Sequence, residues 1–394
     1  MSHNPDRRKW LKTGAALTAG MALAPAAFGK AEKRAGKIKD YSQLRLQPSG
    51  LTRAENIDLP KMKARLLANE NPFGPSKSAK QALKDAIDNS FRYGFGEKKQ
   101  FVEMIAEKEG VTPDHILLGA GSTELLNAAS WYYSHMGKGK LLSGELTYES
   151  LIRTAEEHGC GCERVPLTSD YKLNLQAMAS RVSSDIGMVY LCNPNNPTGT
   201  VVDPDQLMQF CKDVAPEKPV FIDEAYIDYT DDPEKHSMIK CVRMGYDVIV
   251  ARTFSKLHAF AGLRIGYLVA LPATVNKISA FASGGGTIST PSVAAAMASY
   301  QDTDFHRYSF EKNLESKEFV HKTLKANGFS YIPSETNFVF FQLKMRAEDF
   351  QREMMKKGVG VRKWEYQRKQ FCRVSMGTLD EMKMFAEAFK EVTS

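Results

Sequence analysis

Short apolar runs alternate with longer amphipathic segments through the central part of this chain. The runs at 116–118, 187–192 and 219–222 consist almost wholly of apolar residues, which is typical of strands buried on both faces of a sheet. The segments between them, of which 204–214 is one, carry apolar residues at helical spacing. This alternation predicts successive βαβ units, and therefore a parallel or mixed sheet with helices on both faces.

The pattern changes on both sides of this central part. Residues 66–75 form an apolar run broken by Asn-Pro and Gly-Pro, which predicts a short strand ending in turns. After a further strand at 247–251, residues 264–270 predict one antiparallel edge strand. A long helical segment should cover 292–325. Beyond it we expect a smaller α+β region whose strands lie at 338–343, 359–362 and 371–375.

We therefore expect an α/β fold with a large mixed, mostly parallel sheet domain and a smaller α+β domain. With 394 residues, 43% of them hydrophobic, the chain can bury a large core, and two domains are the natural expectation. The expected parts are a signal peptide at 1–29, an N-terminal arm and small-domain segment at 30–75, a large domain at 76–300 and a small C-terminal domain at 301–394.

The N-terminus has the pattern of a targeting segment. Arg7-Arg8-Lys9-Trp10-Leu11-Lys12 precedes the small, weakly apolar run 13–27, and Ala24-Pro25-Ala26 offers a cleavage site between small residues. The run is too short and too rich in alanine for a membrane span. The segment resembles a bacterial twin-arginine signal, which implies export of the folded protein to the periplasm through the twin-arginine translocon. A basic tail followed by a short helix is the alternative.

Charge and cysteine content exclude some classes of function. The formal net charge of +7 is small for this length, and no block of Lys and Arg with interleaved aromatics is present, so nucleic acid is not an expected partner. The six cysteines lack metal-ligand spacing apart from Cys160-Gly161-Cys162, so we expect neither a metal site nor a disulfide framework. Strain would disfavour a disulfide between Cys160 and Cys162.

Candidate chemistry lies where the strand at 247–251 ends, in Thr253-Phe254-Ser255-Lys256. In open α/β sheets, ligands bind at the carboxyl ends of parallel strands. The hydroxyls of Thr253 and Ser255, with Arg264, can hold an anion beside the Lys256 amine. Neighbouring cations and partial burial can lower the pKa of that amine enough for it to attack a carbonyl. These residues suit pyridoxal phosphate, although an ordinary surface lysine is the plain alternative.

A second candidate anion site lies at Gly119-Ala120-Gly121-Ser122-Thr123-Glu124, between a strand and a helix. Free N–H groups and the helix dipole favour negative charge there. A dinucleotide fingerprint would need a third glycine where position 124 is Glu.

Two further strand ends carry polar residues. The strand at 187–192 is followed by the rigid loop 193–199, with two prolines, whose amides can donate to an oxygen anion. The strand at 219–222 is followed by Asp223, and a buried carboxylate there needs a cation. A protonated pyridine nitrogen would supply that cation, and Tyr226 could reach the ring hydroxyl. A helix N-cap is the alternative for Asp223.

Together these motifs resemble the fold-type I, class I/II pyridoxal-phosphate-dependent aminotransferases. The likeness rests on Lys256 in Thr-Phe-Ser-Lys, Asp223 in Asp-Glu-Ala-Tyr, Asn196 in Asn-Asn-Pro-Thr-Gly and Arg264 in Ala-Gly-Leu-Arg-Ile-Gly-Tyr. Three further segments narrow it to the histidinol-phosphate aminotransferase branch: 69–75, 358–362 and 373–378.

The resemblance implies a role for each matching residue. Lys256 would form a Schiff base with the cofactor and then move a proton, Asp223 would pair with the pyridine nitrogen, and Tyr226 would bond the phenolic oxygen. These three are the expected catalytic residues. The remaining expected cofactor contacts are Gly121, Ser122, Thr123, Tyr148, Asn196, Thr253, Ser255, Arg264 and, from a second subunit of a homodimer, Tyr93. The expected substrate contacts are Asn71, Asn337, Arg362 and Arg373.

Some features leave the substrate open. Tyr93 is followed by Gly94 where the family usually has proline, and Trp364 and Tyr366 add aromatic bulk after Arg362. Histidine biosynthesis is cytoplasmic, so an exported enzyme would serve another reaction. We expect transfer of an amino group between an amino acid or histidinol phosphate and a 2-oxo acid. A decarboxylase or carbon–sulfur lyase of the same fold, or a non-catalytic periplasmic binding protein, are the alternatives.

Overall fold

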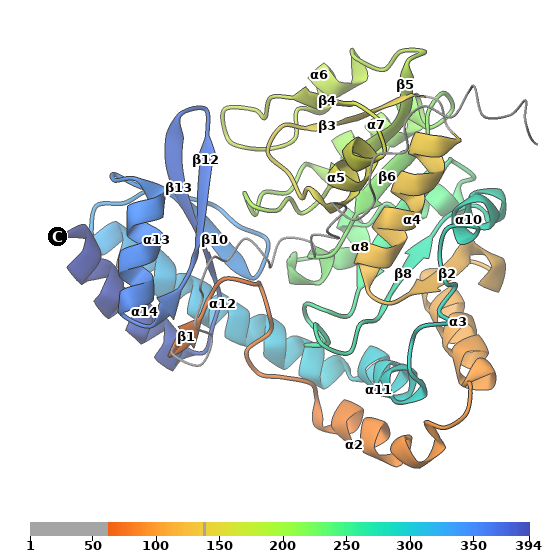
Figure 1. The fold of residues 1–394 in the computed structure, drawn as a ribbon, viewed down its shortest axis with the longest axis horizontal. Coiled ribbons are helices and arrows are strands. Elements are labelled where there is room, and N and C mark those ends of the chain that lie inside the picture. The colour runs from red at the N-terminus through yellow and green to blue at the C-terminus, as the bar shows by residue number, and fades with distance from the viewer. Residues whose placement is uncertain (1–61, 137–138) are drawn as a thin grey trace, which may run out of the picture. The chain divides into compact units, whose positions relative to one another are not determined.

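The computed structural model describes residues 62–136 and 139–394, which lie within one compact unit. The predicted signal peptide at 1–29 and most of the predicted arm lie outside the described residues. Figure 1 shows the described elements.

The larger sheet has seven strands in the order β2-β8-β7-β6-β5-β3-β4. Their bounds are β2 Ile116–Gly119, β3 Lys140–Gly144, β4 Cys162–Val165, β5 Ile186–Cys192, β6 Val220–Asp223, β7 Val248–Thr253 and β8 Gly266–Val269. The neighbours from β4 to β7 pair in parallel, and β8 alone is antiparallel, to both β7 and β2. The mostly parallel mixed sheet expected from the sequence is therefore present.

The position predicted for β8 was wrong. The strand is antiparallel, as expected, but it lies between β7 and β2 instead of at the edge. Residues 265–270 are all buried, and an edge position would leave one row of backbone N–H and C=O groups in this apolar run unpaired. Pairing with the distant β2 satisfies them. The actual edges are β2 and β4, and the sequence analysis did not predict β4.

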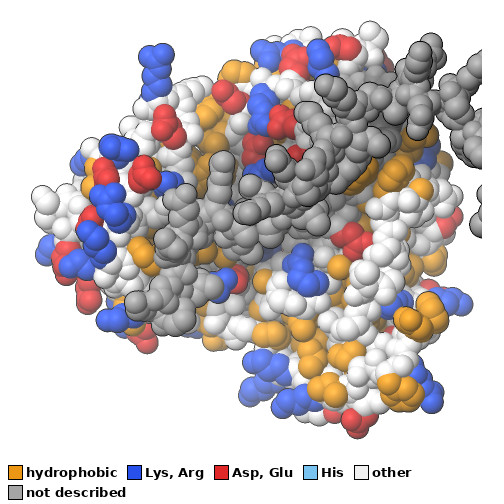
Figure 2. All heavy atoms as spheres, viewed as in Figure 1, with side chains coloured by type: hydrophobic (Ala, Val, Ile, Leu, Met, Phe, Trp, Pro, Cys, Tyr) orange, Lys and Arg blue, Asp and Glu red, His pale blue; other side chains and the backbone are white. Residues whose placement is uncertain are grey.

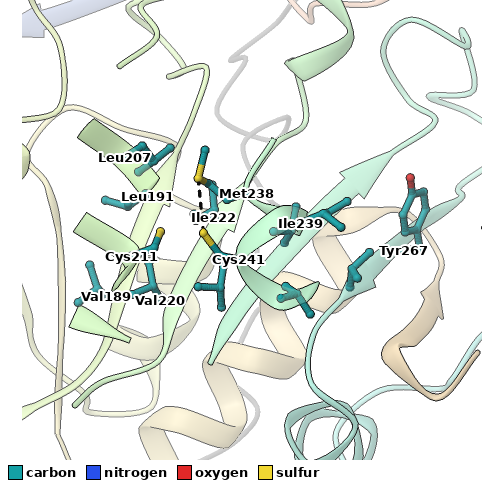
Figure 3. Close-up of a cluster of buried hydrophobic side chains, with 14 of the residues drawn as sticks. Val189, Leu191, Leu207, Cys211, Val220, Ile222, Met238, Ile239, Cys241 and Tyr267 are labelled. Carbon is teal, nitrogen blue, oxygen red and sulfur yellow. Dashed lines mark hydrogen bonds between the residues drawn. The ribbon is translucent and has the colours of Figure 1, made fainter. Parts of the chain in front are cut away.

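Helices cover both faces of this sheet because its strands alternate their side chains. Val220 and Ile222 of β6 belong to one core cluster, whereas Phe221 belongs to another on the opposite face. The first face is covered by α3 Phe95–Glu109, α7 Pro204–Val214 and α9 Ile239–Arg243, and the second by α4 Ser122–His135, α5 Ser150–Glu157 and α10 Pro272–Ser279. Figure 3 shows the first cluster, where Cys211 and Cys241 pack as apolar residues among aliphatic side chains. Each large side chain buried this way contributes about 1.5–3 kcal/mol.

Other helices link the sheets or fill shorter connections. α2 Lys77–Asp85 is capped by Ser76, as predicted, but it ends five residues before the expected Ser90. The predicted helix at 292–325 is two helices, α11 Thr290–Gln301 and α12 Thr303–Ala326, because Asp302 caps the second by accepting from the Phe305 N–H. The two short α-helices in the connections are α6 Leu175–Ala179 and α8 Pro233–His236. Short 3-10 helices lie at Ile87–Asn89, Pro113–His115 and Ile227–Tyr229. Within residues 62–136 and 139–394, no helix is long and apolar enough to span a membrane.

The smaller sheet is antiparallel, in the order β12-β13-β10-β9. It consists of β9 Tyr331–Ile332, β10 Phe338–Gln342, β12 Arg362–Tyr366 and β13 Lys369–Ser375. β1 Ala64–Arg65 and β11 Val359–Gly360 form a separate two-stranded parallel pair. Leu66 and Val361, which directly follow these strands, pack in the same hydrophobic core as the smaller sheet. The predicted strand at 359–362 is thus divided between β11 and β12, and the short strand predicted within 66–75 lies slightly earlier, at β1.

The two faces of this sheet differ. One face packs Val339, Phe341, Cys372 and Val374 against α13 Ala347–Lys356 and α14 Leu379–Thr393. Because side chains alternate along strands, Arg362 and Arg373, which are paired in register, lie on the other face. Figure 2 shows acidic and basic side chains interspersed over α13 and α14, where ion pairs such as Arg352–Asp349 and Lys357–Glu391 form.

Candidate active site

Three parallel strands bring the predicted site residues to one edge of the large sheet. Strands β5, β6 and β7 are neighbours in register, with Cys192 opposite Asp223 and Asp223 opposite Ala251. The loops that follow them therefore meet at their carboxyl ends, where ligands bind in open α/β sheets. This places Asn196, Asp223 and Lys256, which are far apart in the sequence, at the same edge.

Lys256 follows a tight turn in which the Thr253 hydroxyl accepts the Ser255 N–H at 3.1 Å. Its amine donates to the main-chain oxygens of Asn69 at 3.3 Å and Ala68 at 3.5 Å. Burial lowers the pKa of this amine to about 8, and the nearby Arg373 guanidinium adds to the effect. A useful fraction is therefore uncharged near neutral pH, as attack on a carbonyl requires.

Asp223 ends β6 and is only 2% exposed. Burial raises the pKa of its carboxyl to about 7, whereas the main-chain N–H of Ala225, at 3.2 Å, and the Lys256 amine favour the charged form. The Ala225 contact, to Oδ1 of the carboxylate, is the kind of main-chain bond that the N-cap alternative predicted. A cation placed beside this buried carboxylate would favour its charged form.

The start of α4 forms a cradle with Arg264. Gly121 is the N-cap, with φ +79°, and a Cβ there would come within 2.3 Å of Arg264 Nη2. Arg264 donates to Ala120 O at 3.3 Å and to Ser255 Oγ at 3.4 Å. Free N–H groups of the first helical turn, a guanidinium and a hydroxyl thus converge, which is the donor set that a phosphate needs. Ser122 and Thr123 belong to this turn.

Tyr226 and Asn196 lie between the two sheets. Asn196 Nδ2 donates to the Tyr226 hydroxyl at 3.5 Å, while Asn196 Oδ1 accepts from Arg373 Nη1 at 2.6 Å. Burial raises the pKa of the Tyr226 phenol above its usual range. The pKa of Tyr148 is also raised, by burial and by the neighbouring Asp223 carboxyl. Both phenols are therefore protonated donors across the working pH range.

The small sheet contributes two arginines. Arg373 is 4% exposed and donates to Leu67 O at 2.9 Å, and its Nε has no hydrogen-bond partner among the described residues. Burial lowers the pKa of Arg373 to about 10, and the like charge of Arg362 lowers it further. Burial also lowers the pKa of Arg362, whereas Tyr148 and Tyr226 raise it. These causes place Arg362 near the same two phenols, so both guanidinium groups lie at the same candidate site.

Three residues predicted to contact the substrate or the cofactor make contacts that differ from those expected. Asn71 uses its amide on the protein, donating to Leu257 O at 2.7 Å and Ser309 Oγ at 3.1 Å, so it supports the turn after Lys256. Asn337 Nδ2 donates to Asn69 O at 3.0 Å, and its Oδ1 has no partner among the described residues. Tyr93 is 82% exposed and packs on Phe95, outside the site of its own chain.

The sequence analysis missed Asn69 and Ser375 as site residues. Asn69 Nδ2 donates to the Tyr226 hydroxyl at 2.9 Å, and the Ser375 hydroxyl donates to Asn69 Oδ1 at 2.7 Å. The available signal was the pair of asparagines around Glu70, since Asn tolerates the left-handed turn that such a loop needs. The prediction singled out Asn71, whereas Asn69 is the one that touches the catalytic candidates.

These residues fit pyridoxal phosphate by three structural criteria. At Gly121 a Cβ would meet the Arg264 guanidinium, so the absence of a side chain lets this guanidinium approach the start of α4 and complete a phosphate donor set. Asp223 needs a cation, which a protonated ring nitrogen provides. Two buried polar atoms, Arg373 Nε and Asn337 Oδ1, lack partners among the described residues, as expected where a ligand completes the bonding.

A separate cavity of about 540 Å³ shares only Thr253 with the predicted site. Arg252, Tyr267 and Tyr300 are among its lining residues. Several of its polar groups are bonded to one another, for example Arg252 Nη2 to Ser237 Oγ at 3.0 Å and Tyr267 to Glu109 at 2.7 Å. The chemistry therefore points to the strand-end site and not to this cavity.

Comparisons with known proteins agree with this geometry. The profile of the family described as "Aminotransferase class I and II" matches residues 61–389. A histidinol-phosphate aminotransferase of Moorella thermoacetica is 33% identical over 330 residues, which is 83% of this chain and 85% of the relative.

Two solved structures are also similar. A putative histidinol-phosphate aminotransferase from Erwinia carotovora atroseptica has a TM-score of 0.79 and 33% identity, covering 83% of this chain and 95% of its own. The histidinol-phosphate aminotransferase of Sinorhizobium meliloti, solved in complex with pyridoxal-5'-phosphate, has a TM-score of 0.78 and 26% identity, covering 84% and 91%.

Proposed function

The chain belongs to the class I and II aminotransferase family, and from that premise we propose which residues of this enzyme hold the cofactor and which select the substrate. It is a pyridoxal-phosphate-dependent aminotransferase of the fold-type I class. The observation that carries the residue assignment is the Lys256 amine, with its pKa lowered to about 8, at a strand end beside a buried carboxyl and an anion cradle.

The cofactor assignment follows the geometry. Bound pyridoxal phosphate supplies an electron sink for bond breaking at the substrate α-carbon. Asp223 would hold the ring nitrogen protonated, Tyr226 and Asn196 would bind the phenolic oxygen, and Tyr148 would contact the ring. Gly121, Ser122, Thr123, Ser255 and Arg264 would hold the phosphate. Lys256 would carry the cofactor and move a proton at the substrate α-carbon.

The substrate assignment rests on the two arginines of the small sheet. Arg373 binds the α-carboxylate of an amino acid substrate in a bidentate pair. Arg362 binds a second anion, such as the phosphate of histidinol phosphate or the distal carboxylate of glutamate. The curated relatives named as histidinol-phosphate aminotransferases support the phosphate-bearing substrate.

An aromatic substrate remains the second candidate because of the side chains that follow Arg362. Trp364 lies on the same face of β12 as Arg362. The indole Nε1 of Trp364 is buried and has no hydrogen-bond partner among the described residues. Tyr366 instead donates to Glu145 at 3.1 Å and lies 3.4 Å from the Leu167 N–H, so it connects the two sheets. If the substrate is aromatic, truncating Trp364 should raise KM more than truncating Tyr366 does.

The test is a panel of amino donors, histidinol phosphate included, added to the holoenzyme while the cofactor absorbance is followed. A transaminase converts the donor to a carbonyl product without releasing carbon dioxide or thiol. Release of carbon dioxide would favour a decarboxylase, and release of a thiol would favour a carbon–sulfur lyase. If the cofactor binds but no donor changes its absorbance, the assignment as an enzyme is contradicted and the binding-protein alternative gains.

Assembly as a homodimer is part of the proposal. Hydrophobic side chains are exposed around α2 and the segment leading to α3, at the bottom of the view in Figure 2. Ile87, Phe91, Tyr93 and Phe95 are all more than half exposed there, and large apolar side chains exposed together often mark an interaction surface. A second copy of the chain would cover it and receive Tyr93 at its phosphate site. Sedimentation analysis should give a dimer, and a monomer retaining full activity would contradict this.

Export is also proposed, from the N-terminal sequence alone. Replacing Arg7 and Arg8 with lysine should leave the precursor in the cytoplasm, since the paired arginines are the expected signal. Cell fractionation measures this, and unchanged periplasmic enzyme would contradict the twin-arginine route.

A further inference from the structure

Asn69 is at the centre of the hydrogen bonds between the two sheets. Its side chain and main chain are 2% exposed, and it adopts a left-handed conformation with φ +53°, which Asn tolerates better than most residues. Its side chain contacts one residue from each part of the site: Tyr226 from the large sheet and Ser375 from the small sheet. Its main-chain oxygen accepts from Lys256 Nζ at 3.3 Å.

The direction of the Asn69 amide follows from Ser375. The main-chain N–H of Asn69 is necessarily a donor, and it donates to Ser375 Oγ at 2.9 Å. The Ser375 proton then has Asn69 Oδ1, at 2.7 Å, as its acceptor. An oxygen that accepts there leaves the amide nitrogen on the other side, where it donates to the Tyr226 hydroxyl at 2.9 Å.

The direction of the Tyr226 proton follows in turn. The hydroxyl oxygen accepts from Asn69 Nδ2 and, at 3.5 Å, from Asn196 Nδ2. Since both amides are donors, neither can accept the single Tyr226 proton. That proton must point away from both of them. Within the assignment made above, the remaining acceptor is the phenolic oxygen of the cofactor.

We propose that Asn69, fixed by Ser375, is a positioning residue that turns the Tyr226 hydroxyl into a committed donor to the cofactor. The inference deepens the proposed function and rests on its placement of the cofactor ring. Asn69 does not touch the reacting atoms through its side chain. It acts through Tyr226, and its main-chain oxygen seats the Lys256 amine.

The readout is the pH midpoint at which the visible absorbance of the bound cofactor changes, which needs no turnover. A donor to the phenolic oxygen stabilises its anionic form, so losing that donor should raise the midpoint. The charged or titratable groups that face Tyr226 are Arg373, Arg362, Tyr148, Tyr229 and Cys192, with Lys256 Nζ 5.4 Å from its ring centre. They are the same in all variants compared.

The experiment is a double-mutant cycle on the holoenzyme. Tyr226→Phe should raise the midpoint by about one to two pH units, the scale of a hydrogen bond to a charged group. Asn69→Gly, which keeps the left-handed backbone accessible, should raise it by a smaller amount. In the Tyr226→Phe background, Asn69→Gly should add nothing, because the group it directs is gone. Asn174→Asp, at the N-cap of α6, is the control and should leave the midpoint unchanged.

The possible results distinguish a wrong placement of the cofactor ring from a wrong role for Asn69. An unchanged midpoint in Tyr226→Phe contradicts the proposed ring placement, and the inference with it. A shift in Tyr226→Phe with none in Asn69→Gly overturns the inference alone. A shift in Asn69→Gly that persists in the Tyr226→Phe background also overturns it, because it would show a general structural effect. If Asn69→Gly does not fold, Ser375→Ala replaces it, with a smaller shift of the same sign expected and the same contradicting outcomes.

Discussion

The two sheets contribute to the active site in different ways. The large sheet supplies residues from the ends of its strands and the loops that follow them, at Asp223, Asn196 and Ser255. The small sheet supplies residues from the strands themselves, with Arg362 and Arg373 on one face of β12 and β13. Groups from the large sheet bond mostly to their own loops. Arg373 reaches across to Asn196 and Leu67.

This difference suits the large sheet to cofactor binding and the small sheet to substrate selection. Loops at adjacent parallel strand ends can hold one ligand of fixed shape, which suits a cofactor that every reaction uses. A sheet face carries side chains at regular spacing, so a change at Arg362, which the cofactor assignment does not use, can alter the substrate without disturbing the cofactor. We therefore expect substitutions on the large sheet to affect all substrates and those on the small sheet to discriminate among them.

The largest effect should come from Lys256→Ala. Removing the amine eliminates both the carrier and the proton-transfer group, and turnover should fall by at least the roughly 10²–10⁴-fold typical of a positioned acid–base residue. Some cofactor should still bind through Asp223 and the Gly121 cradle. Steady-state kinetics measures this, with the exposed Lys235→Ala as control. Undiminished turnover in Lys256→Ala would refute the assignment.

Asp223→Asn should follow, with a loss of about 10²–10³-fold in turnover for every substrate, the scale of other electrostatic catalytic groups. Without the carboxylate the ring nitrogen loses its counter-charge and the electron sink weakens. Single-turnover rates with two unrelated donors check this. A loss within a few-fold of wild type, or a loss confined to one donor, would contradict the division between the sheets.

The arginines of the small sheet should discriminate. Arg373→Ala should weaken all substrates with an α-carboxylate by about 2–5 kcal/mol, the cost of breaking a buried charge pair. Arg362→Ala should weaken only substrates with a second anion, such as histidinol phosphate and glutamate. Values of kcat/KM for anionic and aromatic donors measure both, with the exposed Arg352→Ala as control. Equal losses for both classes in Arg362→Ala would contradict a discriminating role.

The smallest expected effect concerns stability without cofactor. The folded-state pKa of Asp223 is about 7, above the ordinary value of 3.8, so the folded chain binds the extra proton between these values. The free energy of unfolding that depends on Asp223 should therefore fall as pH rises from about 4 to 7. Asp223→Asn removes this fall. Above pH 7, the free energy of unfolding of the variant apoenzyme should therefore exceed that of the wild-type apoenzyme by up to a few kcal/mol. Urea unfolding at pH 5 and pH 8 checks the sign.

The sequence predicted that Asp223 and Lys256 lie at strand ends of the large sheet, and the structure places them there, because the signal is local. A buried apolar run followed by Asp223, or by Thr253–Lys256, identifies a strand end and its polar residue in one stretch of chain. The position of β8 could not be predicted this way, because its neighbour β2 lies about 150 residues earlier in the sequence. The role of Asn69 depends on Ser375, 306 positions away, and on a left-handed turn that the pattern of apolar residues does not reveal.

The most direct test of the account is to reduce the holoenzyme with borohydride, digest it and map the cofactor by mass spectrometry. The account predicts that the pyridoxyl group is fixed on the peptide containing Lys256, and that Asp223→Asn and Arg373→Ala carry it on the same lysine. A label on any other lysine, or a holoenzyme that retains no label, would contradict the central claim that the end of β7 carries the cofactor.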